Sequence, residues 1–282
     1  MKTENNPFDA LMPVTMAKKA EDVGVYKATK KARQSFYLAI TAGVFISIAF
    51  VFYTTVTTGT NDMPYGISKI IGGLAFSLGL ILVVICGGEL FTSSVLITIA
   101  RASNRITTYQ LLRNWLTVYL GNMVGALIFV AMIWFAQQHM AGHGAWGINA
   151  MTIAQHKLHH SFGQAVILGL LCNLMVCLAI WMTFSCRSAT DKVMVMLLPI
   201  AMFVASGFEH SIANMFMIPM GIVIKVFASP EFWAQTGRSP AEFADLTIGL
   251  FIINNLLPVT LGNIIGGGVV GMTYWNIHRR LN

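Results

Sequence analysis

The chain has 282 residues, of which 56% are hydrophobic and only 10% carry a charge, whereas soluble domains carry about 25% charged residues. A chain this apolar cannot cover itself with polar surface, which excludes an ordinary soluble protein. Its net charge of +7 comes from basic residues in short connections between apolar runs. These residues build no compact basic face, so we expect no nucleic-acid partner.

The N-terminal region is polar and basic and has no apolar core followed by a small-residue cleavage site, so we predict no signal peptide. Residues 7–26 mix apolar and charged side chains, which is typical of a helix lying at a membrane surface. A docking segment for a soluble partner is the alternative. The four cysteines form no CxxC or Cys/His spacing, which indicates small apolar residues rather than a metal site.

Six apolar stretches reach the length, some 20 residues, that a helix needs to cross a bilayer, and the second and fifth are too long to be simple helices. They lie near 36–57, 68–101, 110–136, 162–186, 192–228 and 247–276. The second stretch is interrupted by "GGE" and the fifth by "SGFEH". Unwound backbone at membrane depth is tolerated only inside protein or beside water. We therefore predict two broken helices beside a polar path, with the breaks at Gly87, Gly88, Glu89 and Gly207.

The basic residues predict how the spans are oriented. If alternate connections lie on opposite sides of the membrane, fourteen of the 18 lysines and arginines fall on the side of the termini. The positive-inside rule then places both termini in the cytoplasm. We divide the chain accordingly into a cytoplasmic amphipathic segment (1–34), a six-span domain (35–277) and a short cytoplasmic C-terminus (278–282).

The two halves of the six-span domain share short matches in the same order. "SFYLAITAG" at 35–43 matches "SFGQAVILG" at 161–169, and the break "GGE" matches "GFE" at 207–209. "NWLTVYLGNMVG" at 114–125 matches "NLLPVTLGNIIG" at 255–266. With three spans in each half, the halves enter the bilayer from opposite sides. The predicted fold is an all-α membrane protein with a 3+3 inverted repeat, its halves at about 35–136 and 161–276.

The ionisable residues in the breaks have two interpretations each. Glu89 and Glu209 are expected either to cap the N-terminus of a half-helix or to act in the path. His210 has an ordinary pKa near 6.5, which suits a pH sensor or a proton donor. A membrane enzyme using Glu209 and His210 as acid and base is a rival, weakened because no nucleophile or metal-ligand set lies beside them.

The connection before the fourth span reads "IAQHKLHHSF". Its HxxHH pattern is a weak metal signal, because no acidic or cysteine partner follows nearby. A solvated loop with Lys157 at the mouth of a vestibule is the simpler interpretation, since a cation there raises the local concentration of anions. We expect no metal and no cofactor.

The chain resembles the formate/nitrite transporter family over nearly its whole length. The resemblance lies in "NPFD" at 6–9, "VYKATK" at 25–30, "ASGFEHSIANM" at 205–215 and "GNIIGGG" at 262–268. It implies a homopentamer in a bacterial cytoplasmic (inner) membrane, with an aquaporin-like pore in each protomer. It implies formate as the solute, with nitrite, hydrosulfide or another small monovalent anion as the alternative. Membrane lipid and the cytoplasmic formate-producing lyase, docked on the N-terminal segment, are the other implied partners.

The resemblance also implies roles for individual residues. His210 corresponds to the central pore histidine and Thr92 to the threonine facing it, and the remaining pathway residues are Lys157, Asn173, Glu209 and Asn263. The cytoplasmic-side constriction corresponds to Leu80, Leu90 and Phe91, and the periplasmic-side constriction to Phe76, Val176 and Phe203. We expect His210 either to lend formate a proton so that formic acid crosses, or to supply a positive field to the anion.

Overall fold

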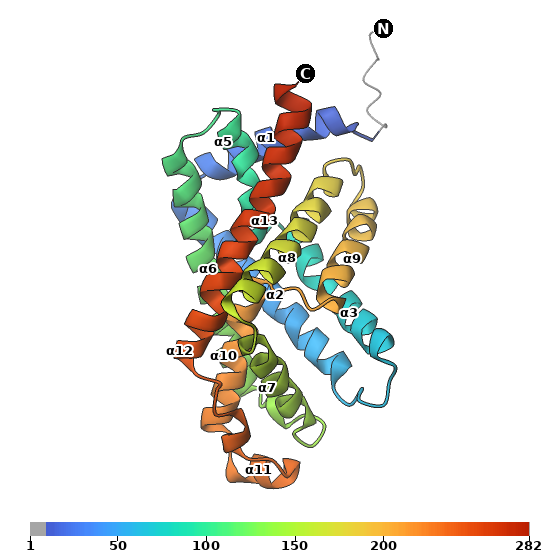
Figure 1. Ribbon diagram of the computed structural model, residues 1–282, viewed down its shortest axis with the longest axis vertical. Coiled ribbons are helices and arrows are strands. Elements are labelled where there is room, and N and C mark those ends of the chain that lie inside the picture. Colours follow the sequence, from blue (N-terminus) through green and yellow to red (C-terminus); the bar gives the residue numbers. More distant parts are fainter. Residues whose placement is uncertain (1–9, 282) are drawn as a thin grey trace.

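The computed structural model describes residues 10–281, and in that part of the chain the regular secondary structure is helical (Figure 1). Residues 1–9, with the "NPFD" element and the start of the predicted surface helix, lie outside the described residues. The first half contains α1 (Pro13–Thr29), α2 (Ala32–Thr57), α3 (Tyr65–Cys86), α4 (Phe91–Ser94), η1 (Val95–Ile97), α5 (Thr98–Ala102) and α6 (Thr108–Phe135). The second half contains η2 (Gln138–Met140), α7 (Ala145–Leu158), α8 (Phe162–Thr183), α9 (Ala189–Ala205), α10 (Ser211–Phe227), α11 (Pro230–Thr236), η3 (Pro240–Phe243), α12 (Ile248–Leu250), η4 (Phe251–Leu256), α13 (Leu257–Trp275) and η5 (Asn276–Arg280).

These helices account for the six predicted crossings. By length and composition, α2, α3, α6, α8 and the stretch from η3 to η5 are each able to span a membrane. The fifth crossing is divided between α9 and α10, which have 17 residues each. Figure 1 places α1 and the end of the chain at one end of the molecule, and α11 at the opposite end.

One predicted loop is wrong. Where the sequence indicated a solvated loop before the fourth span, the chain forms α7, a 14-residue helix. Met151, Ala154 and Leu158 bury one of its faces. The hydropathy of α7 is too low to mark a span, but every third or fourth residue is apolar, and that spacing is sufficient for packing against α10.

Both predicted helix breaks are confirmed. α3 ends at Gly87, whose φ of 89° is left-handed, and the N–H of Gly88 donates to Val83 O at 2.7 Å. α9 ends in the same way at Gly207, with φ of 72°. Glycine takes this conformation without a Cβ clash, so the sequence stops each helix at a defined residue.

Two asparagines from the repeat hold the chain on the far side of each break. Asn122 on α6 accepts from the N–H of Phe91 and donates to the carbonyls of Ala39 and Glu89. In the second half, Asn263 on α13 accepts from Ser211 N–H and donates to Gly169 and Glu209 carbonyls. Each asparagine therefore satisfies backbone groups that the break releases. This matched set confirms the inverted repeat.

The sequence match between the first and fourth spans is out of register. If Ser35 corresponded to Ser161, Leu38 would correspond to Gln164. In the structure Leu38 corresponds instead to Leu168, which lies four residues after Gln164. The Leu38 carbonyl accepts from Glu89 N–H, and the Leu168 carbonyl accepts from Glu209 N–H. A shift of four residues is about one helical turn and preserves the face of small residues, which explains why the letters matched.

Close helix packing around the path depends on glycines of α6 and α13. A Cβ on Gly262 would lie 2.0 Å from the carbonyl oxygen of Val166, whereas a Cβ on Gly268, six residues along the same helix, would meet nothing within 4 Å. We expect Gly262→Ala to destabilise the protein by about 3 kcal/mol, because the α8 backbone has to move.

The matched substitution Gly268→Ala should be neutral or stabilising, by up to about 1 kcal/mol, because alanine has the better helix propensity. Thermal unfolding of the two variants in detergent measures the difference. Equal unfolding midpoints would show that the contact between α8 and α13 tolerates a side chain.

Candidate functional site

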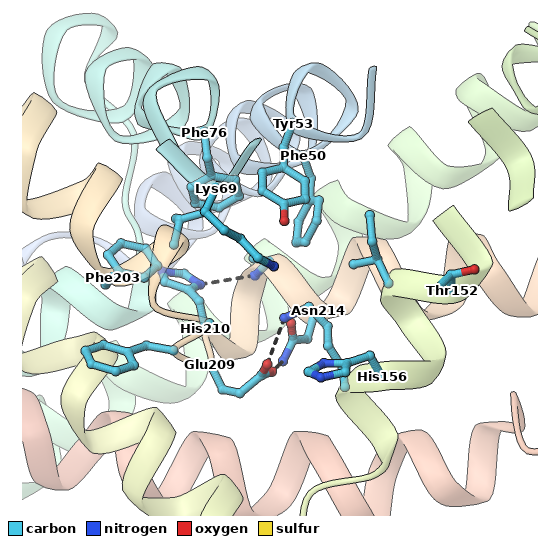
Figure 2. A pocket seen from close by; sticks show the side chains of 16 residues that line it. Phe50, Tyr53, Lys69, Phe76, Thr152, His156, Phe203, Glu209, His210 and Asn214 are labelled. Atoms are coloured by element: carbon cyan, nitrogen blue, oxygen red, sulfur yellow. Dashed lines mark hydrogen bonds and ion pairs between the residues drawn. The ribbon is translucent and has the colours of Figure 1, made fainter. Parts of the chain in front are cut away.

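A cavity of about 280 Å³ lies between α2, α3, α7, α9 and α10 (Figure 2). Aromatic side chains from α2, α3 and α9 form much of its wall, and the break after α9 forms its inner end. The lining residues that matter below are Phe50, Tyr53, Lys69, Phe76, Lys157, Phe203, Glu209, His210 and Asn214. The cavity is thus apolar on most sides and carries polar groups at the break, as solute sites in proteins generally do.

The imidazole of His210 lies in the break and is 3% exposed. Its Nδ1 accepts the backbone N–H of Ala213 at 3.1 Å, so the histidine caps the N-terminus of α10. A neutral imidazole whose Nδ1 accepts carries its proton on Nε2. That Nε2–H donates to the hydroxyl oxygen of Thr92, 3.0 Å away. The geometry therefore defines the tautomer of the neutral ring.

Thr92 comes from the other break and joins the two halves of the repeat. It lies on α4, is fully buried, and its carbonyl accepts from the side-chain amide of Asn173 at 3.1 Å. The same amide donates to the carbonyl of Asn263 at 2.6 Å. Asn173 and Asn263 do not line the cavity, so they position the two breaks rather than the solute.

Glu209 is the most heavily bonded side chain of the site. Its carboxylate is 2% exposed and pairs with the ammonium of Lys157 at 2.9 Å. The amides of Asn214 and Asn255 donate to its other oxygen at 2.6 and 3.2 Å. The expectation that Glu209 caps a half-helix is wrong, because His210 takes that role. Lys157, expected as a solvated cation, is 14% exposed in its side chain and lies in this network.

An equivalent ion pair at the other break escaped sequence analysis. Glu89, 2% exposed, pairs with Lys30 at 2.6 Å and Lys27 at 3.1 Å, and both lysines come from the α1 region. It does not cap α4, whose N-cap residue is Leu90. The amide of Asn114 donates to the carbonyl of Lys27, just as the amide of Asn255 donates to that of Lys157. Lys27 is therefore the counterpart of Lys157, and α1 is the counterpart of α7.

The six predicted constriction residues are all buried: Phe76, Leu80, Leu90, Phe91, Val176 and Phe203. Phe76 and Phe203 lie edge to face with ring centroids 6.1 Å apart and form part of the cavity wall. Phe203 also stacks on the His210 ring at 6.2 Å. The other four do not line this cavity. Phe91 instead packs on Tyr119, with ring centroids 4.9 Å apart.

The histidines before the fourth span are engaged separately. His159 pairs with Asp245, whereas His160 lies 3.8 Å from Glu209. In the described part of the chain, no group of three or more metal-binding side chains comes together. His156 lines the cavity, whereas His159 and His160 approach the carboxylates of Asp245 and Glu209 and are not among its lining residues.

Comparison with known proteins agrees with this geometry. The family model described as formate/nitrite transporter matches residues 14–276. The chain is 63% identical over 279 residues to the formate channel FocA of Escherichia coli K12, covering 99% of this chain and 98% of that relative. It is 53% identical over 271 residues to the formate channel FocA of Haemophilus influenzae, covering 95% of each chain.

Two solved structures have the same fold. A pentameric formate channel with formate bound superposes with a TM-score of 0.85 at 64% identity, covering 88% of this chain and 97% of that one. An FNT-family ion channel superposes with a TM-score of 0.77 at 24% identity, covering 93% and 98%. By sequence and by fold, the chain belongs to the formate/nitrite transporter family.

Proposed function

We propose that this protein is a formate channel in which the cavity admits the solute and His210 controls its passage. The observation that carries the proposal is the position of the imidazole, at the inner end of an apolar cavity and bonded to Thr92 of the opposite break. The relatives named formate channel, and the solved channel with formate bound, supply the solute.

The apolar wall determines which form of the solute crosses. Removing a charge from water into an apolar constriction is costly, so a neutral molecule passes more easily than an anion. Lys157 draws formate toward the cavity, and Glu209 holds that ammonium in place. A protonated His210 then gives one proton to formate and becomes neutral, and formic acid crosses between the aromatic side chains.

The hydrogen bonds of His210 couple this transfer to the protein. The neutral ring keeps its acceptor bond from Ala213 N–H, whereas an imidazolium has a proton on both nitrogens and loses that bond. Protonation therefore releases the cap of α10, and proton donation restores it. The rival version, in which the anion itself moves past a positive field, predicts electric current without a change in pH.

Flux through purified protein in proteoliposomes tests the proposed solute. We expect formate to cross faster than nitrite, acetate and hydrosulfide, and faster as the external pH falls, because the imidazole has to gain a proton before it can lend one. If nitrite or hydrosulfide crosses faster than formate, the protein is a channel of the same family for that other solute.

The assembly and the orientation are also part of the proposal. The solved relative is a pentamer, and we assign the same assembly to this chain, in the inner membrane of a bacterium. The distribution of lysines and arginines supports cytoplasmic termini. The lyase that produces formate would then meet the channel at its N-terminal segment.

We propose further that α1 controls the cytoplasmic mouth. Its Glu21 is 1% exposed and binds Arg279 at 2.7 Å and Ser103 at 2.7 Å, which ties α1 to the C-terminal η5 and to the end of α5. The residue following it, Asp22, is exposed and pairs only with Arg105 in the described residues.

We expect Glu21→Gln to loosen α1, because the substitution removes a buried negative charge that faces the half-exposed guanidinium groups of Arg279 and Arg105. Hydrogen exchange of residues 13–29 should rise by about tenfold, a change of about 1.4 kcal/mol in the opening free energy, and formate flux should lose part of its pH response. Asp22→Asn is the matched control and should leave both unchanged. If Glu21→Gln raises hydrogen exchange but leaves the pH response of formate flux unaltered, α1 does not control the cytoplasmic mouth.

A further inference from the structure

A second cavity, of about 260 Å³, lies far from the solute path between the end of α6, η2 and the start of α11. It continues into an apolar groove of about 400 Å³ between α6 and α10. Trp134, Phe135 and Phe227 line both. The two spaces therefore form one elongated site, with a polar end at the cavity and an apolar end along the helices.

The site lies where the membrane boundary is expected. α6 ends at Phe135, and α11 bends away from α10 by 104°, so that α11 runs across the end of the span (Figure 1). Aromatic side chains are enriched at this level of membrane proteins. Phe135 is 82% exposed and Phe227 66% exposed, as expected for side chains that contact lipid.

The polar end contains a side chain with an unused hydrogen-bonding atom. His139 is only 5% exposed, and its Nδ1 has no hydrogen-bond partner. The imidazole stacks on Trp134, with centroids 4.5 Å apart, and contacts Phe232. Buried polar atoms in proteins nearly always have a partner. The Nδ1 atom is itself enclosed, so a ligand in the cavity that His139 lines reaches it after a small rotation of the ring.

The chemistry of the polar end selects the ligand. Burial lowers the pKa of His139, which keeps the imidazole neutral and able to accept a hydrogen bond. The carboxylate of Glu231 lines the same cavity, and neither the cavity nor the groove is lined by lysine or arginine. The site therefore favours a cationic hydrogen-bond donor over an anion.

We propose that this site binds one phospholipid with a primary ammonium headgroup, of the phosphatidylethanolamine type. The ammonium lies between Glu231 and His139, and an acyl chain occupies the groove between α6 and α10. Ala131 and Val223 line the groove, where the chain contacts only apolar atoms. The lipid thus joins the end of α6 to the bend between α10 and α11, at a distance from the solute path.

Native mass spectrometry of the intact, delipidated oligomer tests the proposal. The protein is titrated with phosphatidylethanolamine, with phosphatidylcholine of the same acyl chains, which lacks N–H donors, and with phosphatidylglycerol, which is anionic. We expect phosphatidylethanolamine to bind about tenfold more tightly than either, the preference that one charge-assisted hydrogen bond supplies. Equal binding of the three lipids would overturn the proposal.

Three variants and a control locate the site. Glu231→Gln and His139→Phe should each remove the headgroup preference, and Ala131→Trp should reduce binding of all three lipids by filling the groove from an exposed position. Glu242→Gln, an exposed acid paired with Arg238, should change nothing. Headgroup preference surviving in both Glu231→Gln and Ala131→Trp contradicts the assignment. Lipid bound only to dissociated single chains also contradicts it, since a neighbouring copy would then cover the groove in the assembly.

Discussion

His210→Asn should assemble normally and lose most proton-coupled formate uptake. Asparagine is a good N-cap residue and can accept the N–H of Ala213 as the imidazole does, so α10 should keep its start. The amide takes up no proton near neutral pH and has none to lend. Because a general acid contributes at least about 100-fold to the steps it assists, we expect uptake at low external pH to fall by about that factor.

Formate uptake into proteoliposomes, scanned from about pH 5 to 8, measures this loss. The matched control is His159→Asn, the same substitution at a side chain that is 61% exposed and outside the cavity. The control should keep the wild-type pH profile. Uptake by His210→Asn that still rises with acidity would remove His210 from proton transfer and favour the anion-conducting version.

Glu209→Gln should lower the stability of the protein much more than a substitution in an exposed ion pair does. The carboxylate balances Lys157 and accepts from two asparagine amides in a site that is almost closed to water. Removing one partner of a buried ion pair costs about 3–5 kcal/mol, because the other charge remains buried. For a chain of this size we expect the unfolding midpoint to fall by about 10 °C.

Thermal unfolding in detergent measures the effect. Glu242→Gln breaks the exposed pair with Arg238 and should shift the midpoint by no more than about 2 °C, since exposed pairs contribute little. Adding Lys157→Met to Glu209→Gln should recover part of the loss, because no unpaired charge remains. A drop no larger than that of the control would mean that water enters the network and solvates Lys157.

The cavity side and the α1 side of the protein each contain a buried lysine–glutamate ion pair beside a helix break. Lys157 and Glu209 stand at one break, and Lys27 and Glu89 stand at the other. In each pair the lysine comes from a helix outside the six spans, α7 or α1. The N-terminal helix is therefore part of the repeat, which extends beyond the halves that sequence comparison indicated.

The sequence by itself determined the membrane class, the six crossings and the positions of both breaks. These features are local: hydropathy is summed over a window, and a glycine beside an ionisable residue marks the break at its own position. The equivalence of Asn122 and Asn263 in the two halves could also be predicted, because both asparagines stand beside glycines at the same spacing.

Only the tertiary structure decided the partners of the polar residues and the register of the repeat. Lys27 and Glu89 are far apart in the sequence, and nothing local connects a lysine of α1 with a carboxylate in a break. The first and fourth spans matched one turn out of register, because residues four apart lie on the same face of a helix. The spacing of residues in the sequence defines which face of a helix they share. The register of one helix against the next is decided by backbone contacts between the helices.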